Sequence, residues 1–156
     1  MSKNYGKDFE EKFKSDWLEI PNATIDRLYD TMNGYKSISQ ISDFIGYIFP
    51  NIFYLECKVH EGNTFPFSNL TQYDKLLTKV NIPGVRTGVV LWMIDHDVIV
   101  YLPISSIYKM KQDNKKSFNI KMLQTNEYKI ITIPTSKKRV FLKANYSILK
   151  ELNEGD

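Results

Sequence analysis

Two adjacent segments rich in Ile, Phe, Tyr and Val constrain the fold more than any other part of the chain. They run over 42–49 and 51–59, and a Pro50-Asn51 pair separates them. β-Branched and aromatic residues favour strands, and proline followed by asparagine is typical of a tight turn. The two segments are therefore predicted to form an antiparallel β-hairpin.

Helices are predicted on both sides of this hairpin in the sequence. Phe9, Phe13 and Trp17 recur every four residues with charged residues between them, which predicts an amphipathic helix over 6–19. A second helix is predicted over 70–80 from its apolar spacing. The remaining predicted elements are strands over 88–94, 98–102, 128–133 and 139–142 and helices over 104–110 and 145–152. This order indicates an α/β fold with helices on a mixed sheet.

The length and composition fit a single intracellular domain. A chain of 156 residues is close to the usual domain size of roughly 100–150 residues. No apolar run approaches the roughly 20 residues of a membrane span, and the N-terminal region carries charges throughout, so neither a membrane segment nor a signal peptide is expected. The single cysteine, Cys57, excludes an internal disulfide and a multi-cysteine zinc site.

Positive charge is concentrated in one region of the sequence. Residues 109–143 hold ten Lys and Arg against two Asp and Glu, whereas residues 1–108 hold ten against thirteen. A basic segment with aromatic residues between the cations suits a polyanion such as nucleic acid. A solvated, lysine-rich surface is the alternative, and the charge pattern alone does not decide between the two.

Three charged residues of the predicted hairpin could act together in catalysis. Glu56 and Lys58 are two residues apart, so their side chains leave the same face of a strand, and a turn near Pro50 brings Asp43 opposite them. Mg²⁺ prefers oxygen ligands, and a neighbouring lysine can orient or deprotonate the attacking water, so the set suits metal-assisted phosphodiester hydrolysis. The alternative is a surface Glu–Lys pair near a turn aspartate.

The sequence around these residues carries a longer pattern. Asp43-Phe-Ile-Gly46 is followed by Phe53-Tyr-Leu-Glu56-Cys-Lys58. This combination resembles the core motif of the PD-(D/E)xK nuclease superfamily. Three further segments resemble parts of the RecU-like Holliday junction resolvases. The first is Gly6-Lys-Asp-Phe-Glu10, and the second is Ile25-Asp26-Arg27. The third is Thr64-Phe-Pro-Phe67 together with the nearby Leu70-Thr-Gln72. The resemblance covers about residues 5–108 and is closest to the resolvases carried by phages of low-GC bacteria.

The resemblance implies a restriction-endonuclease-like α/β core, with a mixed β-sheet flanked by helices, in one nuclease domain over 1–156. It implies Mg²⁺, replaceable by Mn²⁺, on four ligands: Asp43, Glu56, Glu10 and the backbone carbonyl of Cys57. Lys58 would position or activate the water with support from Gln72. The implied substrate is branched DNA, a four-way junction, cut by a homodimer in the cytoplasm of a bacterial host.

Basic side chains are expected to hold the DNA backbone. The resemblance gives this role to Arg27, and the short segment 29–39 with Lys36 stands where the bacterial resolvases carry a longer stalk. The other predicted contacts are Arg86, Lys115, Lys116, Lys137, Lys138 and Arg139. Two alternatives remain, which are a nuclease of repair or restriction type with another substrate, and a catalytically inactive module that binds junctions or other DNA.

Overall fold

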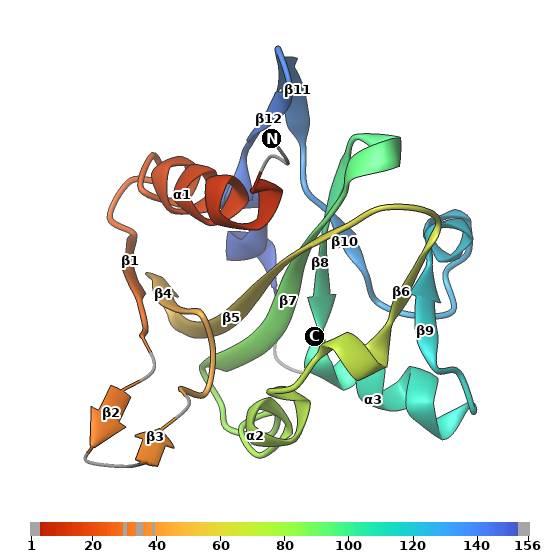
Figure 1. Ribbon diagram of the computed structural model, residues 1–156, viewed down its shortest axis with the longest axis horizontal. Coiled ribbons are helices and arrows are strands. Elements are labelled where there is room, and N and C mark those ends of the chain that lie inside the picture. The colour runs from red at the N-terminus through yellow and green to blue at the C-terminus, as the bar shows by residue number, and fades with distance from the viewer. Residues whose placement is uncertain (1–3, 30, 34–35, 39, 153–156) are drawn as a thin grey trace.

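A six-stranded mixed β-sheet forms the centre of the molecule in the computed structural model, which describes residues 4–29, 31–33, 36–38 and 40–152. In spatial order its strands are β1 (Thr24–Arg27), β4 (Phe44–Ile48), β5 (Asn51–His60), β7 (Val85–Met93), β8 (Val98–Pro103) and β10 (Ile131–Thr132) (Figure 1). β5 and β7 run parallel, and the other neighbouring strands run antiparallel. The sheet is therefore mixed, as predicted.

Smaller elements surround this sheet. The described helices are α1 (Tyr5–Trp17), α2 (Tyr73–Leu77) and α3 (Ile104–Gln112), with short 3₁₀ segments η1 (Phe67–Asn69), η2 (Ile94–His96), η3 (Ile120–Gln124) and η4 (Tyr146–Glu151). Two-stranded sheets pair β2 (Thr31–Asn33) with β3 (Lys36–Ile38), β6 (Thr64–Pro66) with β9 (Ser117–Asn119), and β11 (Thr135–Lys138) with β12 (Phe141–Ala144). Within the described ranges, no helix is long and apolar enough to span a bilayer.

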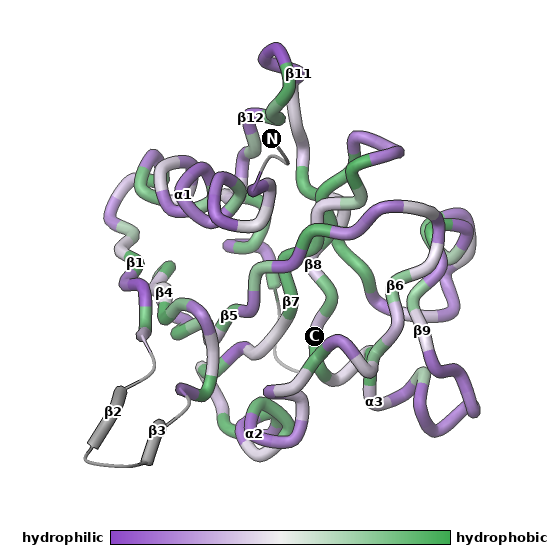
Figure 2. Tube along the Cα trace, viewed as in Figure 1, coloured by the Kyte–Doolittle hydropathy of each residue, from purple (hydrophilic) through white to green (hydrophobic). Residues whose placement is uncertain are grey.

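The central sheet is buried on both faces. Along β7, Val90 and Trp92 belong to a hydrophobic core under α1, whereas Val89 and Leu91 belong to a second core under α2 and α3. Side chains of a strand alternate between the two faces, so a strand covered on both sides reads as a continuous apolar run. Figure 2 shows this hydrophobic run along β7 and β8 at the centre of the molecule.

The α1 helix packs on β4 and β5, since Phe13 contacts the Phe44 ring and Trp17 contacts the Phe53 ring. Phe9, Phe13 and Trp17 are buried, which confirms the predicted amphipathic helix. A Cβ atom at Gly46 would lie 2.8 Å from the Trp17 ring, so the strand and the helix approach more closely than a larger residue would allow. The Trp17 Nε1 atom also donates to the Thr24 carbonyl at 2.9 Å, which ties the end of α1 to β1. This packing sets the position of the acidic face of α1.

The predicted hairpin is confirmed as β4 and β5. The two strands are antiparallel, with Phe44 opposite Leu55 and Ile48 opposite Asn51. β5 continues beyond the start of β4 toward His60. Residues 56–60 therefore extend past β4, and the residue that precedes β4 lies beside them.

Other elements differ from the prediction for physical reasons. The helix predicted over 70–80 is limited to α2, because the flanking residues form tighter turns, in which the Tyr73 N–H donates to the Leu70 carbonyl and the Val80 N–H donates to the Leu77 carbonyl. The predicted C-terminal helix is the 3₁₀ segment η4. β1 was not predicted, because Ile25 alone is buried there and one apolar residue produces no alternation.

Candidate active site

A small polar hollow lies where β4 begins and β5 runs past it. Its volume is about 260 Å³, and its lining residues are Arg27, Leu28, Tyr29, Gln40, Ser42, Asp43, Glu56, Lys58, Thr71 and Gln72. The hollow therefore brings together five residues that the sequence placed in or near an active site: Arg27, Asp43, Glu56, Lys58 and Gln72. Gln72 arrives from the segment that leads into α2, so four separate parts of the chain, 27–29, 40–43, 56–58 and 71–72, form the hollow.

Strand register places Asp43 beside Glu56. Phe44 pairs with Leu55, so the residue before β4 lies opposite Glu56. An Asp43 Oδ2 atom accepts a hydrogen bond of 2.9 Å from the Cys57 N–H. The Cys57 side chain points to the α1 core, as predicted, so Glu56 and Lys58 on the other face of β5 point toward the hollow.

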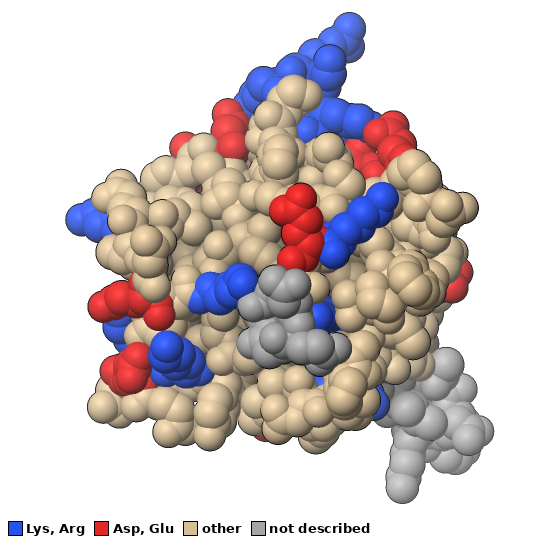
Figure 3. Space-filling view, turned by 180° about the vertical axis from the view of Figure 1, so that it is seen from behind, with Lys and Arg blue, Asp and Glu red and all other residues tan. Residues whose placement is uncertain are grey.

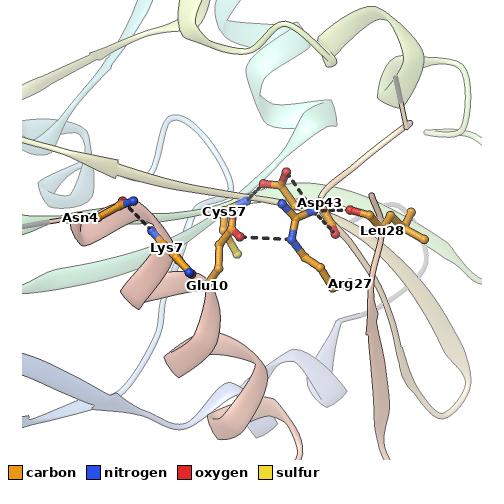
Figure 4. A network of polar contacts seen from close by, with 7 residues as sticks. All are labelled: Asn4, Lys7, Glu10, Arg27, Leu28, Asp43 and Cys57. Carbon is orange, nitrogen blue, oxygen red and sulfur yellow. Dashed lines mark hydrogen bonds and ion pairs between the residues drawn. The ribbon is translucent and has the colours of Figure 1, made fainter. Parts of the chain in front are cut away.

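Arg27 lies between two of the predicted metal ligands. Its Nε atom is 3.1 Å from a Glu10 carboxylate oxygen, and one terminal nitrogen is 3.7 Å from Asp43 Oδ1 (Figure 4). That nitrogen also donates to the backbone carbonyls of Leu28 and Asp43. The resemblance directed Arg27 at the DNA backbone, and the structure places its guanidinium in the carboxylate cluster. Arg27 thus neutralises part of the negative charge there.

Glu10 reaches the site from the exposed side of α1. The helix begins after Asn4, whose side chain accepts a hydrogen bond from the Lys7 N–H at 3.1 Å (Figure 4). Partial burial raises the pKa of Glu10, the Arg27 charge opposes this shift, and the Asp43 carboxylate adds to it. Glu10 therefore interacts electrostatically with Asp43 although it does not line the hollow, and its predicted role as a metal ligand stays a prediction.

Glu56 has the most perturbed carboxyl of the cluster. It is 5% exposed, and burial together with the neighbouring Asp43 carboxylate raises its pKa to about 8, against the opposing effect of Lys58. Burial likewise raises the pKa of the Cys57 thiol well above its ordinary value, with a smaller effect from Asp43. Without a metal ion, Glu56 therefore holds a proton at neutral pH.

The donor set fits a hard cation that keeps part of its own hydration. No three His, Cys, Asp or Glu side chains in the described ranges form a complete metal site. Asp43 and Glu56 offer carboxylate oxygens, and the Cys57 carbonyl points to the same strand edge as the Cys57 N–H that binds Asp43. Mg²⁺ is usually held by one or two carboxylates, with water and phosphate oxygens as further ligands. The residues therefore fit Mg²⁺ completed by water and a phosphate.

The predicted basic segment does not form one continuous patch. Lys115 and Lys116 lie just beyond α3, whereas Lys137, Lys138 and Arg139 lie at the projecting end of the β11–β12 hairpin, far from α3 (Figure 1). The tip of this hairpin is visible as a basic projection in Figure 3. Two of the five are in ion pairs, since Lys115 is 3.2 Å from Glu127 and Lys137 is 2.7 Å from Asp97.

Two other predicted DNA contacts have different outcomes. Arg86 is 7% exposed, and its guanidinium donates to the Asn51 side chain and to the Leu152 carbonyl. This buried position argues against the predicted phosphate contact and indicates a structural role, in which Arg86 ties β7 to the C-terminal segment. The side chain of Lys36 lies outside the described part of the chain, so its predicted contact stays a prediction.

Sequence reasoning missed several residues that shape the hollow. Ser42 is buried, and its hydroxyl donates to the Phe44 carbonyl at 2.8 Å, which fixes the backbone that presents Asp43. Gln40 and Thr71 also line the hollow. The available signal was their position next to Asp43 and Gln72 in the sequence, because polar residues that flank a candidate site residue often share its pocket.

Comparison with known proteins identifies the fold. No protein-family model matches the chain, and a search of curated proteins found no match. Among solved structures, the chain is similar to Hjc, a Holliday junction resolvase from the archaeal hyperthermophile Archaeoglobus fulgidus. The TM-score is 0.50 at 14% sequence identity, over 65% of this chain and 78% of that chain. The chain therefore has the restriction-endonuclease-like fold that its motif implied.

Proposed function

We propose that this protein is a Mg²⁺-dependent endonuclease that resolves four-way DNA junctions by hydrolysing phosphodiester bonds. The observation that supports it most is the convergence of Asp43, Glu56 and Lys58 in one polar hollow. The fold adds support, because the similar structure from Archaeoglobus fulgidus is a Holliday junction resolvase. The same proposal includes a homodimer, whose two sites would each nick one of two opposed strands, and a role in phage recombination inside a bacterial cell.

The roles of the residues follow from their positions. Asp43, Glu56 and the Cys57 carbonyl would hold Mg²⁺, with Glu10 at the edge of the site. When bound, Mg²⁺ supplies a Lewis acid and lowers the pKa of a bound water. Side chains of the protein would position the attacking water and the metal ligands.

The Lys58 ammonium would orient the attacking water and offset the charge that develops on the phosphate oxygens. Gln72 would donate or accept a hydrogen bond at the same water, because it lines the same hollow as Lys58. Arg27 would keep Glu10 and Asp43 in position through its ion pairs.

The test compares two DNA shapes and two variants. A labelled four-way junction and a linear duplex of matched sequence are incubated with the purified protein in Mg²⁺, and again in Mn²⁺. Asp43→Asn keeps the side-chain shape but removes the ligand charge, and Asp74→Asn makes the same change on the exposed side of α2 as a control. We expect paired symmetric nicks in the junction alone, lost with Asp43→Asn and kept with Asp74→Asn.

The other outcomes are equally decisive. If the linear duplex is cut as fast as the junction, the proposed nuclease activity is correct and the proposed selectivity for junctions is wrong. If the parent protein binds the junction but cuts it in neither metal, the proposed catalytic activity is wrong and the protein is a DNA-binding module. Cutting that survives in Asp43→Asn would mean that the hollow is not the active site.

A further inference from the structure

A second hollow lies beside the candidate active site, at the C-terminal end of α3. Its volume is about 560 Å³. Pro66, Phe67 and Ser68 line one side, and Lys111, Lys115 and Lys116 line the other, with no acidic residue in the lining. We call it the lysine hollow. An apolar wall that faces several ammonium groups suits a ligand that carries both negative charge and apolar surface.

One short segment of chain borders both hollows. Ser68 lines the lysine hollow, and Thr71, three residues further on, lines the candidate active site. Three residues span at most about 11 Å. Figure 1 shows η1 between the strands of the site and the end of α3. A nucleic acid strand with one phosphate in the active site could therefore reach the lysine hollow within a few nucleotides.

Two lysines on this border are held in place, Lys111 through its side chain and Lys116 through its backbone. The Lys111 Nζ atom lies 3.8 Å from the centre of the Tyr73 ring, and Tyr73 directly follows Gln72 of the active site. A cation–π contact of this kind restricts the side chain before any ligand binds, which lowers the entropic cost of binding. Lys116 is fixed through its backbone, because its carbonyl accepts from the Phe67 N–H.

The charges of the three lysines differ in availability. Lys115 pairs with Glu127 at 3.2 Å and lies over the Tyr128 ring. In the described part of the chain, no acidic side chain pairs with Lys111 or Lys116. These two residues therefore supply the positive charge that the hollow offers to a ligand.

We propose that the lysine hollow binds the DNA backbone a few nucleotides from the phosphate in the active site. Lys111 and Lys116 would contact phosphate oxygens, and the exposed surface of Pro66 and Ser68 would contact the sugar. The inference rests on the proposed function in that it takes DNA as the substrate. It assigns strand positioning to Lys111 and Ser68 individually, whereas the sequence proposed DNA contact for the basic segment 109–143 as a whole.

Salt dependence of binding tests the proposal directly. Lys111→Gln/Lys116→Gln is compared with Lys109→Gln/Lys121→Gln, a control pair of exposed lysines. Lys109 lies in the same last helical turn as Lys111 but about 200° around α3. Affinity for a four-way junction is measured without divalent ions between about 50 and 200 mM salt.

Removing two phosphate contacts is expected to reduce the slope of log K against log salt by about 2 and to weaken binding at low salt by about tenfold. The control pair should leave the slope within error of the parent. An unchanged slope in the Lys111/Lys116 variant, or an equal change in both pairs, would overturn the proposal.

Cleavage separates this proposal from the proposed function. Substrates carry one neutral methylphosphonate at successive positions beside the cut. In the parent protein, a methylphosphonate at one position a few nucleotides from the cut should slow cleavage. In Lys111→Gln/Lys116→Gln, a methylphosphonate at the same position should slow cleavage no further. If Lys111→Gln/Lys116→Gln shows the predicted slope change but the parent protein never cuts DNA, the proposed nuclease activity is wrong and the proposed role of the lysine hollow is kept. If the parent protein cuts DNA but the salt slope of the variant equals that of the parent, only the proposed role of the lysine hollow is wrong.

Discussion

Glu56 carries a proton in the metal-free protein because two physical effects disfavour its charge. Burial removes the carboxylate from water, and the Asp43 carboxylate repels it, so its pKa rises to about 8. A divalent cation beside both carboxylates would remove this penalty, since it is the largest local charge in such a site. The same feature that makes Glu56 costly without metal therefore makes it a suitable ligand with metal.

This raised pKa predicts how stability depends on pH. Above its ordinary value of 4.5, Glu56 is ionised in the unfolded chain but keeps its proton in the folded protein up to about pH 8. The folded state therefore binds more protons in this window, and the contribution of Glu56 to the free energy of unfolding falls as pH rises from about 4.5 to about 8. Above that window the contribution is fully lost.

Glu56→Gln should remove this pH dependence, because glutamine does not ionise. In EDTA, we expect the variant to be more stable than the parent at about pH 8.5, by on the order of 2–4 kcal/mol, and similar to it at about pH 4.5. Denaturant unfolding at both pH values measures the difference. Glu61→Gln, an exposed position just after β5, is the control and should follow the parent. A Glu56→Gln variant that is equally or less stable at high pH would contradict the raised pKa.

At the scale of elements, a buried aspartate fastens the end of α1 to β12. Asp16 is 2% exposed, and its carboxylate accepts from Lys12 at 2.8 Å, from Lys143 at 3.1 Å and from the Ala144 N–H at 3.0 Å. Buried carboxylates are stable only when charge and hydrogen bonds compensate them. Because Glu10 lies on the same helix, this contact also holds one side of the candidate active site.

Asp16→Ala should therefore destabilise the protein by about 2–4 kcal/mol, because it leaves the Ala144 N–H without its acceptor and removes both ion pairs. Glu19→Ala is the matched control, since Glu19 pairs with the same Lys143 but its side chain is 60% exposed. Exposed pairs contribute about 0–1 kcal/mol. Urea unfolding of both variants decides the matter, and equal losses would show that the buried contact has no special role.

The elements that the sequence predicted well are those with a local signal. The hairpin over 42–59 combines strand-favouring residues with a turn pair, and the first helix repeats Phe9, Phe13 and Trp17 at helical spacing. β1 and the β6–β9 pair were missed because their short strands are stabilised by partners far away in the sequence. The helix predicted over 70–80 was too long, because tighter i to i−3 turns at Tyr73 and Val80 bound α2 on both sides.

In the candidate site too, the contacts with a local sequence signal could be predicted and the contacts between distant segments could not. Asp43, Glu56 and Lys58 could be placed together because one hairpin register relates them. The Arg27–Glu10 pair joins β1 to α1, and nothing in the local sequence of either element indicates that contact. The burial of Arg86 was equally hidden, because its partners Asn51 and Leu152 lie 35 and 66 residues away in the sequence.

At the scale of the whole molecule, the basic residues lie in two separate places. The lysine hollow adjoins the active site, whereas the tip of the β11–β12 hairpin projects from the opposite end of the molecule (Figures 1 and 3). Lys143 and Ala144 anchor the base of this hairpin to Asp16. The arms of a four-way junction diverge, so one arm at the active site would leave a second arm free to reach the hairpin tip.

The hairpin tip should therefore contribute to junction binding more than to duplex binding. In Lys138→Gln/Arg139→Gln, we expect junction affinity to fall by about tenfold at low salt, while affinity for a short duplex stays within about twofold. Lys137 is left unchanged because its ion pair with Asp97 holds the hairpin. Fluorescence anisotropy with both DNA shapes measures the two affinities under one set of conditions. An equal loss for both shapes would mean that the tip contacts any DNA, and the preference for branched DNA would then have to come from the active-site face.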